Sequence, residues 1–284
     1  MVSIIIPVYN EGKTILVCLT SLSQQSYSPM EIIVVDDGST DNSELRIKNL
    51  IRQLAERIKN LRFYKQKHQG PGKARNLGAE YAKGDILVFV DADMTFDQDF
   101  IKYLIQPIVE NRSKGTFTKE EYVSNWDNVW ARCWNYNEGL ATSRRISPDY
   151  PTRSPVFRAI LKSEFIKVKG FEENIGFTDD WTLSRKLGYK STPADKAICY
   201  HANPQTLGEV YCQARWIGKN EFISGLNWKR VINLLRFNPF IQTFRAIFIS
   251  LKYKEIMCMV FSLYYYSGIT VSIFLSFFHE AKYK

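Results

Sequence analysis

Apolar and polar residues alternate regularly over the first hundred positions of the chain. Four short runs are almost wholly apolar: VSIIIPV (2–8), EIIVVDD (31–37), LRFYKQ (61–66) and DILVFVDAD (85–93). Such runs are typical of strands that are buried on both faces of a parallel sheet. Between them, apolar side chains recur at helical spacing in residues 11–25, 45–58 and 70–84. This order, with its short connections, predicts an α/β fold with a doubly wound, mostly parallel central sheet.

The alternation ends after one more predicted helix, at residues 97–111. Residues 105–225 show no further βαβ pattern, which predicts a second lobe of mixed structure. Trp126, Trp130 and Trp134 are spaced by four residues and so predict an aromatic helix face. Aromatic faces of this kind more often pack in a core than bind a ligand.

The last part of the chain is apolar in a different way. Ile256–Phe278 contains 23 residues without a charge, about 34 Å as a helix, against a bilayer core of roughly 30 Å. Serine, threonine and tyrosine dilute this segment, so three interpretations stay open: a helix that spans the membrane, one that lies in its plane, and a core helix. Residues 237–251, with Arg245 in their middle, better fit a helix in the membrane interface.

Positive charge is concentrated in the same tail. The chain of 284 residues has a net charge of +9, and residues 229–284 hold eight Lys or Arg against two Glu. Basic side chains interleaved with Phe, Ile and Leu favour an anionic membrane surface. We therefore expect no nucleic-acid partner. The five cysteines have no CxxC or zinc spacing, which favours reduced thiols and a cytosolic compartment. The N-terminus lacks a basic region and cleavage site, so we expect no signal peptide.

Pairs of carboxylates follow two of the predicted strands, and a third pair lies further along. Asp36 and Asp37 end the second strand, Asp91 and Asp93 end the fourth, and a third pair occurs in GFTDDWTLSRKLG. A single acidic strand end is most simply a solvated terminus. In an open α/β sheet, however, ligands bind beyond the carboxyl ends of the strands. Mg²⁺ and Mn²⁺ prefer oxygen ligands, often one or two carboxylates beside substrate phosphates. Two such ends therefore favour a shared cation-dependent site.

The loop HQGPGKARNLG brings opposite charge to the start of a predicted helix. Lys73 and Arg75, beside flexible glycines, could face a diphosphate. The loop has neither the P-loop pattern nor the GxGxxG spacing of dinucleotide-binding proteins.

Together these segments resemble a known family. IIIPVYNEGKTI, EIIVVDDGSTDNS, GPGKARNLGAEYAKGDILVFVDADM and GFTDDWTLSRKLG occur in the order and at the spacings typical of inverting glycosyltransferases of family 2. The resemblance covers residues 2 to about 220. It implies a GT-A (Rossmann-like) fold with a nucleotide-sugar-binding half at 1–105 and an acceptor-binding and catalytic half at 106–228. The apolar and basic composition described above predicts a membrane-associating helical tail at 229–284.

The resemblance also implies residue roles at the nucleotide. Pro7, Tyr9 and Glu11 correspond to the first nucleotide-binding loop. Asp36 corresponds to the carboxylate that holds the base or ribose, with Asp37 in its turn. Lys73 and Arg75 would belong to the segment that closes over the nucleotide.

Metal and catalytic roles follow in the same way. Asp93 would ligate Mn²⁺ or Mg²⁺, and Asp91 would assist through the ribose or a water. His201 lies where some members place a metal or phosphate contact, although a lone histidine is more often structural. The acidic pair of the family, usually Glu-Asp, corresponds to Asp179 and Asp180, with Asp180 as the expected general base.

A further segment, QARWIG (213–218), is similar to the Q-x-x-R-W motif of processive members. Its spacing is one residue short, so polymer synthesis is not implied. Arg215 and Trp216 remain candidates for contact with the diphosphate or the acceptor.

The function implied is that of an enzyme of EC class 2.4. It would transfer a sugar from a UDP-, GDP- or dTDP-sugar to a hydroxyl of a lipid-linked or cell-surface glycan, at the cytoplasmic face of the cell membrane, with a peripheral or single-span tail. A polyprenyl-phosphate sugar synthase and a non-catalytic nucleotide-sugar-binding membrane protein remain alternatives. A nucleotidyltransferase is disfavoured, because PVYNEGKTI offers no glycine-rich activation loop.

Overall fold

The structure is a computed structural model that describes residues 1–54, 60–173, 178–219, 223 and 227–278. The chain divides into two compact units. We call the first the sheet unit, built mainly from Met1–Glu121, Pro148–Asn174 and Asp179–Tyr200. The second, the helical unit, is built mainly from Tyr122–Ser147 and His201–Lys284. The functional boundaries expected at residues 105 and 228 stay a prediction.

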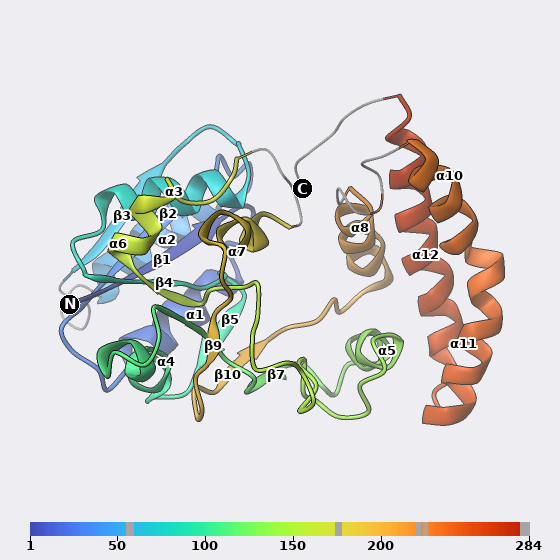
Figure 1. The fold of residues 1–284 in the computed structure, drawn as a ribbon. Coiled ribbons are helices and arrows are strands. Elements are labelled where there is room, and N and C mark those ends of the chain that lie inside the picture. Colours follow the sequence, from blue (N-terminus) through green and yellow to red (C-terminus); the bar gives the residue numbers. More distant parts are fainter. Residues whose placement is uncertain (55–59, 174–177, 220–222, 224–226, 279–284) are drawn as a thin grey trace. The chain divides into compact units, whose positions relative to one another are not determined.

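The sheet unit is organised around a seven-stranded sheet (Figure 1). Its strand order is β3-β2-β1-β4-β8-β6-β9, and every pairing is parallel except those of β8. The predicted mostly parallel sheet is therefore confirmed. The strands are β1 (Val2–Val8), β2 (Met30–Asp36), β3 (Leu61–Lys65), β4 (Ile86–Phe89), β6 (Gly115–Phe117), β8 (Ala159–Leu161) and β9 (Thr192–Pro193).

Helices cover both faces of this sheet, which explains why its central strands are apolar throughout. In β1, Ile4 and Ile6 belong to the core that includes α1 and α4, whereas Ile5 faces the core that includes α3. The helix predicted over 70–84 ends earlier, at Tyr81. The helices are α1 (Thr14–Ser23), α2 (Ser43–Leu54), α3 (Pro71–Tyr81), α4 (Phe100–Val109), α6 (Lys162–Lys167) and α7 (Thr182–Leu187), with a single 3₁₀ turn at Asp179–Trp181.

A second, three-stranded sheet has the order β5-β10-β7. Its strands are short, and two of them, β7 and β10, come after α4, where the βαβ pattern ends. They are β5 (Met94–Phe96), β7 (Glu121–Val123) and β10 (Cys199–His201).

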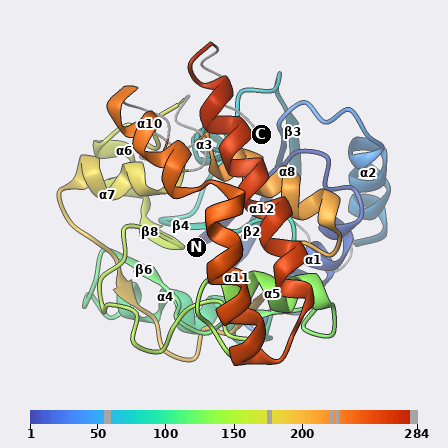
Figure 2. The same ribbon diagram turned by 90° about the vertical axis from the view of Figure 1, so that its right-hand side faces the viewer.

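The helical unit packs around α12, the segment predicted as an apolar helix (Figure 2). Phe261, Tyr265 and Ile269 of α12 are buried against α8 and α5. Trp130 and Trp134 pack in this core, as predicted, but Trp126 precedes the helix. The helices are α5 (Val129–Asn137), α8 (Leu207–Ile217), α10 (Asn227–Arg236), α11 (Pro239–Tyr253) and α12 (Met257–Leu275).

Two glycines let α8 and α12 approach closely. A Cβ atom on Gly268 would lie 2.7 Å from the carbonyl oxygen of Tyr211, and one on Gly218 would lie 2.7 Å from Cβ of Ser272. Among the described residues, α12 is the one helix that is long and apolar enough to cross a membrane, and half of its most apolar window is buried. It therefore has a core-helix face as well as an exposed face.

Candidate active site

The loops that follow three parallel strands, β1, β2 and β4, lie at one edge of the main sheet. Val8 of β1 is level with Asp36 of β2, and Ile5 of β1 is level with Phe89, the last residue of β4. Tyr9, Asp36 and Asp91 therefore all lie at the carboxyl edge of the sheet. This is the edge at which ligands bind in open α/β folds.

An arginine connects two of the predicted acidic clusters. Arg75 donates from Nη1 to Asp179 Oδ2 (2.7 Å) and from Nη2 to Asp91 Oδ1 (2.9 Å). Arg158 donates to the other oxygen of Asp91, Oδ2, over 3.0 Å. Both arginine side chains are largely buried, with 11% and 16% of their surface exposed. Each oxygen of Asp91 therefore has an arginine partner.

Glycines position Arg75 for this contact. Gly70 has a φ of 91° and caps α3, whose first residue is Pro71. At Gly72 a Cβ atom would lie 3.1 Å from Asp179 Oδ2, and at Gly78 it would lie 2.5 Å from a methyl carbon of Ile5. Small residues on α3 thus let the helix approach both the sheet and the acidic pair.

The acidic pair holds protons more tightly than ordinary carboxylic acids. Burial raises the pKa of Asp179, and the guanidinium of Arg75 partly opposes that shift. Burial, together with the neighbouring Asp179, raises the pKa of Asp180 to about 7. A carboxylate with a pKa near neutrality can both accept and release a proton at physiological pH.

Asp36 offers a hydrogen-bond acceptor at the same edge. Its Oδ1 accepts from the backbone N–H of Ser39 over 2.9 Å. Its Oδ2 is buried and forms no hydrogen bond with any residue that the structure describes; Lys65 Nζ lies 4.0 Å away. A buried carboxylate oxygen of this kind is costly to leave unsatisfied, which favours a ligand donor here.

The carboxylate of Asp37, unlike that of Asp36, has protein partners for both of its oxygens. Its carboxylate accepts from the backbone N–H groups of Gln69 (2.9 Å) and Gly70 (2.8 Å) and contacts His68 Nδ1 (2.9 Å). The His68 ring stacks on Tyr9, with centroids 4.0 Å apart. Sequence reasoning assigned no role to His68, although it opens the glycine-rich loop and could have been noticed there.

Other predicted residues of the first loops have local partners. Glu11 Oε2 accepts from Thr14 Oγ1 (2.8 Å), and Lys73 pairs with Glu173 over 2.7 Å. Pro7 lies within β1 and is half-buried. Asn10, which the sequence prediction did not assign, accepts from the backbone N–H of Thr40 (2.8 Å) and so joins the loops after β1 and β2.

The remaining predicted residues belong to the helical unit. Arg215 donates from Nε to Ser272 Oγ over 3.0 Å, and Trp216 follows it in α8. His201 is half-buried in β10, and its backbone oxygen accepts from Ser124 N–H. Their contact with a diphosphate, an acceptor or a metal stays a prediction.

The donor set fits a metal ion whose coordination is completed by substrate. Among the described residues, no group of three or more His, Cys, Asp or Glu side chains could hold a metal. Mg²⁺ and Mn²⁺ sites of nucleotide enzymes need only one or two carboxylates beside phosphate oxygens. Asp91 is engaged by two arginines, whereas Asp93 is a half-buried carboxylate at the same edge. The assignment of Asp93 as the direct ligand, which the family resemblance implies, stays a prediction.

Comparison with known proteins establishes the family. Residues 3–168, more than half of the chain, match the profile described as Glycosyl transferase family 2. The chain belongs to glycosyltransferase family 2. A poly-beta-1,6-N-acetyl-D-glucosamine synthase of Staphylococcus aureus is 27% identical over 224 residues, covering 76% of this chain and 53% of the relative. The chain thus spans about half the length of the curated relatives it matches.

Solved structures show the same fold. The mannosyltransferase PcManGT from Pyrobaculum calidifontis, in complex with GDP-Man and Mn²⁺, matches with a TM-score of 0.63 at 16% identity, over 98% of this chain and 87% of that one. TarS 1-349 of S. aureus, in complex with UDP-GlcNAc, matches with a TM-score of 0.56 at 17% identity, over 96% and 90%. The predicted GT-A fold is confirmed.

Proposed function

We propose that this protein transfers a sugar, with inversion, from a nucleotide-sugar donor to a hydroxyl group of a glycan or lipid-linked acceptor. The observation that carries the proposal is the network in which Arg75 joins Asp91 to Asp179, beside Asp180. It brings buried positive charge and a proton acceptor to the edge where a family-2 glycosyltransferase would bind its donor.

The nucleoside would occupy the loops that follow β1 and β2. Asp36 Oδ2 is the acceptor available for an N–H of the base or a hydroxyl of the ribose. Tyr9 and the His68 stacked on it would border the base. Asp37 would act indirectly, because its hydrogen bonds fix the backbone of Gln69 and Gly70.

The leaving diphosphate would lie beside Asp91 and Asp93. A divalent cation held by Asp93 would supply positive charge to that diphosphate as the bond to the sugar breaks. Arg75 and Arg158 hold Asp91 in place. Their guanidinium groups also add fixed positive charge near the reacting centre, which stabilises negative charge that develops there.

Asp180 would take the proton from the acceptor hydroxyl as that oxygen attacks the anomeric carbon. Its raised pKa, about 7, makes it a stronger base than an ordinary aspartate. Attack from the face opposite to the leaving diphosphate would invert the anomeric configuration. Asp179, held by Arg75, would keep the pair in position.

The α10–α11 surface supports membrane association. We define it as the exposed apolar side chains of these two helices: Trp228, Val231, Ile232, Leu235, Phe240, Ile241, Phe244, Ile247, Phe248 and Leu251. Lys229 and Arg236 lie among them in the sequence, and Lys252 follows Leu251. Exposed aromatic and aliphatic residues with cations favour an anionic bilayer surface. We propose that this surface lies on the cytoplasmic face of the membrane, where a lipid-linked acceptor would be accessible.

The donor assignment is tested with purified full-length protein. A thermal-shift screen would compare UDP-GlcNAc, GDP-Man and dTDP-glucose, each with and without Mn²⁺, because a ligand that binds the folded state raises its unfolding temperature. We expect one donor to stabilise the protein, more strongly with Mn²⁺, and to be hydrolysed slowly. In Asp36→Ala, that stabilisation should be lost. If no nucleotide sugar stabilises the protein or is turned over, the proposal fails.

A further inference from the structure

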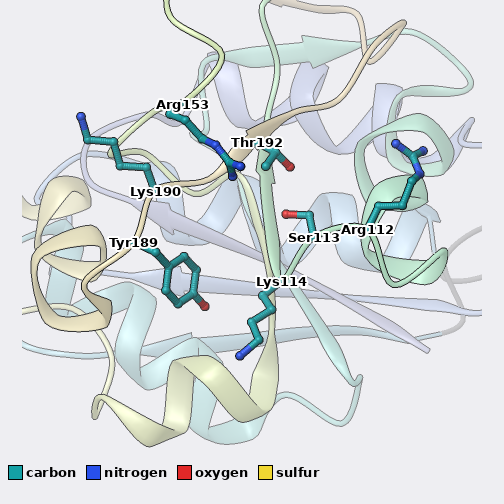
Figure 3. A pocket seen from close by; sticks show the side chains of 7 residues that line it. All are labelled: Arg112, Ser113, Lys114, Arg153, Tyr189, Lys190 and Thr192. Carbon is teal, nitrogen blue, oxygen red and sulfur yellow. The ribbon is translucent and has the colours of Figure 1, made fainter.

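The sheet unit contains a cavity at the edge opposite to the candidate active site. Its volume is about 540 Å³, within the range of about 300–1,000 Å³ of small-molecule sites. Seven residues line it: 112–114 just before β6, Tyr189 and Lys190 just before β9, Thr192 at the start of β9, and Arg153 (Figure 3). Since β6 and β9 run parallel to β4, their starts lie at the amino edge of the sheet.

The lining is strongly basic. Four of its seven side chains are cationic, namely Arg112, Lys114, Arg153 and Lys190, and none is acidic. Arg112 and Lys114 have carboxylate partners outside the lining, since Arg112 pairs with Glu110 and Lys114 with Glu164. No ion pair or hydrogen bond involves the side chain of Arg153 or Lys190 within the part of the chain that the structure describes.

Buried serines fix the backbone beside these two cations. Ser154 and Ser191 form an antiparallel bridge with two backbone hydrogen bonds, of 3.2 and 2.9 Å. Ser191 Oγ adds a hydrogen bond to the backbone oxygen of Ser154, over 3.0 Å. Arg153 and Lys190 each lie next to one of these serines, so the bridge fixes the backbone from which both side chains extend.

Two of the lining residues carry hydroxyl groups, Ser113 and Thr192, and Ser113 Oγ donates to the backbone oxygen of Gly115 over 2.8 Å. Figure 3 shows the guanidinium of Arg153 directed toward Thr192, with the hydroxyl of Ser113 nearby. Thr192 Oγ1 is buried, and no described residue forms a hydrogen bond with it. A buried hydroxyl without a partner is unfavourable, so a ligand oxygen that accepts its proton would stabilise the site.

We propose that this basic cavity is a second ligand site, which binds the phosphate group of a small molecule such as a sugar phosphate. The guanidinium of Arg153 and the hydroxyl of Thr192 are donors that suit a tetrahedral oxyanion. The cavity is larger than one phosphate, and the ring of Tyr189 offers an apolar wall for a sugar. The site is separate from the donor site, because the two lie at opposite edges of the same sheet.

Calorimetry on the full-length protein tests this site with inorganic phosphate and with glucose 6-phosphate, in the presence and absence of UDP with Mn²⁺. Tighter binding of glucose 6-phosphate assigns the site to a sugar phosphate, and equal affinity assigns it to free phosphate. Arg153→Ala/Lys190→Ala should lower the affinity at least about tenfold. The matched control, Arg52→Ala/Lys83→Ala, removes two exposed cations elsewhere in the sheet unit and should change it less than about twofold.

Thr192→Val provides a readout that does not depend on charge. It removes the unsatisfied hydroxyl, so the free protein should unfold at an equal or higher temperature while phosphate binding weakens. Three results would overturn the proposal: no binding of either probe, equal loss in both double variants, or displacement of the probe by UDP. Because UDP binding at the other edge is measured separately, failure here is distinguishable from failure of the proposed function.

Discussion

At the scale of single residues, the acidic pair at Asp179 and Asp180 is held in an unfavourable environment. Burial opposes ionisation of both, and Arg75 compensates only in part. An active site commonly keeps such groups because the reaction needs their altered proton affinity. Two properties of Asp180, in activity and in stability, follow from this environment.

Asp180→Asn should abolish sugar transfer, with a loss of about 10²-fold to 10⁴-fold, because the amide cannot accept the acceptor proton. Donor binding should persist, since the nucleoside is proposed to bind other residues, Asp36 and Tyr9. Initial rates and donor calorimetry check the two expectations. In the parent protein, the rate at low donor and acceptor should rise with pH and be half-maximal near pH 7. Asp195→Asn, an exposed control, should behave like the parent. Turnover close to that of the parent in Asp180→Asn would exclude this general base.

The same residue should make stability depend on pH. Since the folded-state pKa of Asp180, about 7, exceeds its ordinary value of 3.8, the folded protein keeps a proton that the unfolded chain loses between about pH 4 and pH 7. Its contribution to stability is therefore present at low pH and is lost as the pH rises through that range. Asp180→Asn should unfold several degrees higher than the parent at pH 8, and at nearly the same temperature at pH 4. A shift that is equal at both pH values would contradict the raised pKa.

Metal dependence should separate Asp93 from its neighbour Asp91. Asp93→Ala should weaken donor binding in Mn²⁺ by about tenfold or more and leave metal-free binding nearly unchanged, because a lost ligand acts only through the cation. Titration calorimetry with and without Mn²⁺ measures the difference, with Asp195→Ala as the control. An unchanged affinity in Mn²⁺ would remove Asp93 from the metal site.

The sequence predicts the acidic residues of this site better than it predicts the residues that contact them. Asp36 and Asp91 end apolar strands, so the sheet pattern alone brings them to one edge. Arg158 could not be assigned, because it precedes a strand with no motif and reaches Asp91 only through the antiparallel insertion of β8. His68 was missed for a similar reason: its role depends on the ring of Tyr9 from a different loop.

At the scale of elements, the contact between α8 and α12 determines how the helical unit packs. A Cβ atom on Gly268 would lie 2.7 Å from a backbone oxygen and 2.8 Å from Cβ of Ala214. Neither atom can move without displacing a helix. The composition of the tail predicts an apolar helix. Because α12 has apolar side chains on every face, however, its buried face could not be predicted from periodicity.

Gly268→Val should therefore destabilise the protein by roughly 1–3 kcal/mol or more, as expected for overpacking of a core. Gly208→Ala is the matched control, because its Cβ atom would meet nothing nearer than Thr206 Oγ1 at 3.8 Å and alanine favours a helix. Denaturant unfolding measures both. If Gly268→Val were as stable as the parent, the close approach of α8 and α12 would be refuted.

At the scale of the whole molecule, membrane affinity should come from the α10–α11 surface rather than from α12 alone. Deleting the tail from residue 229 would remove α12 from the core of the helical unit, so it cannot test anchoring by itself. Substitution of exposed side chains avoids this problem. Phe240, Phe244 and Phe248 lie one turn apart on α11 and are 71–76% exposed.

Replacing these three phenylalanines by serine should release most of the protein from vesicles that contain phosphatidylglycerol, measured by sedimentation. The remaining binding should fall as salt rises, because the basic residues act through screened charges. Val17→Ser/Val109→Ser/Ile166→Ser removes three exposed apolar side chains from the sheet unit and should leave binding unchanged. Undiminished sedimentation of the α11 variant would contradict this surface.

Because Gly72 has no side chain, the position of the Asp179 carboxylate can be changed by a single added methyl group. One methyl group there would lie 3.1 Å from Asp179 Oδ2 and 3.1 Å from the backbone oxygen of Glu172. Gly72→Ala would thus shift a carboxylate by a few tenths of an ångström without altering any charge. Position 72 offers a way to weaken the Arg75–Asp179 contact gradually, and so to measure how much of the rate depends on placement alone.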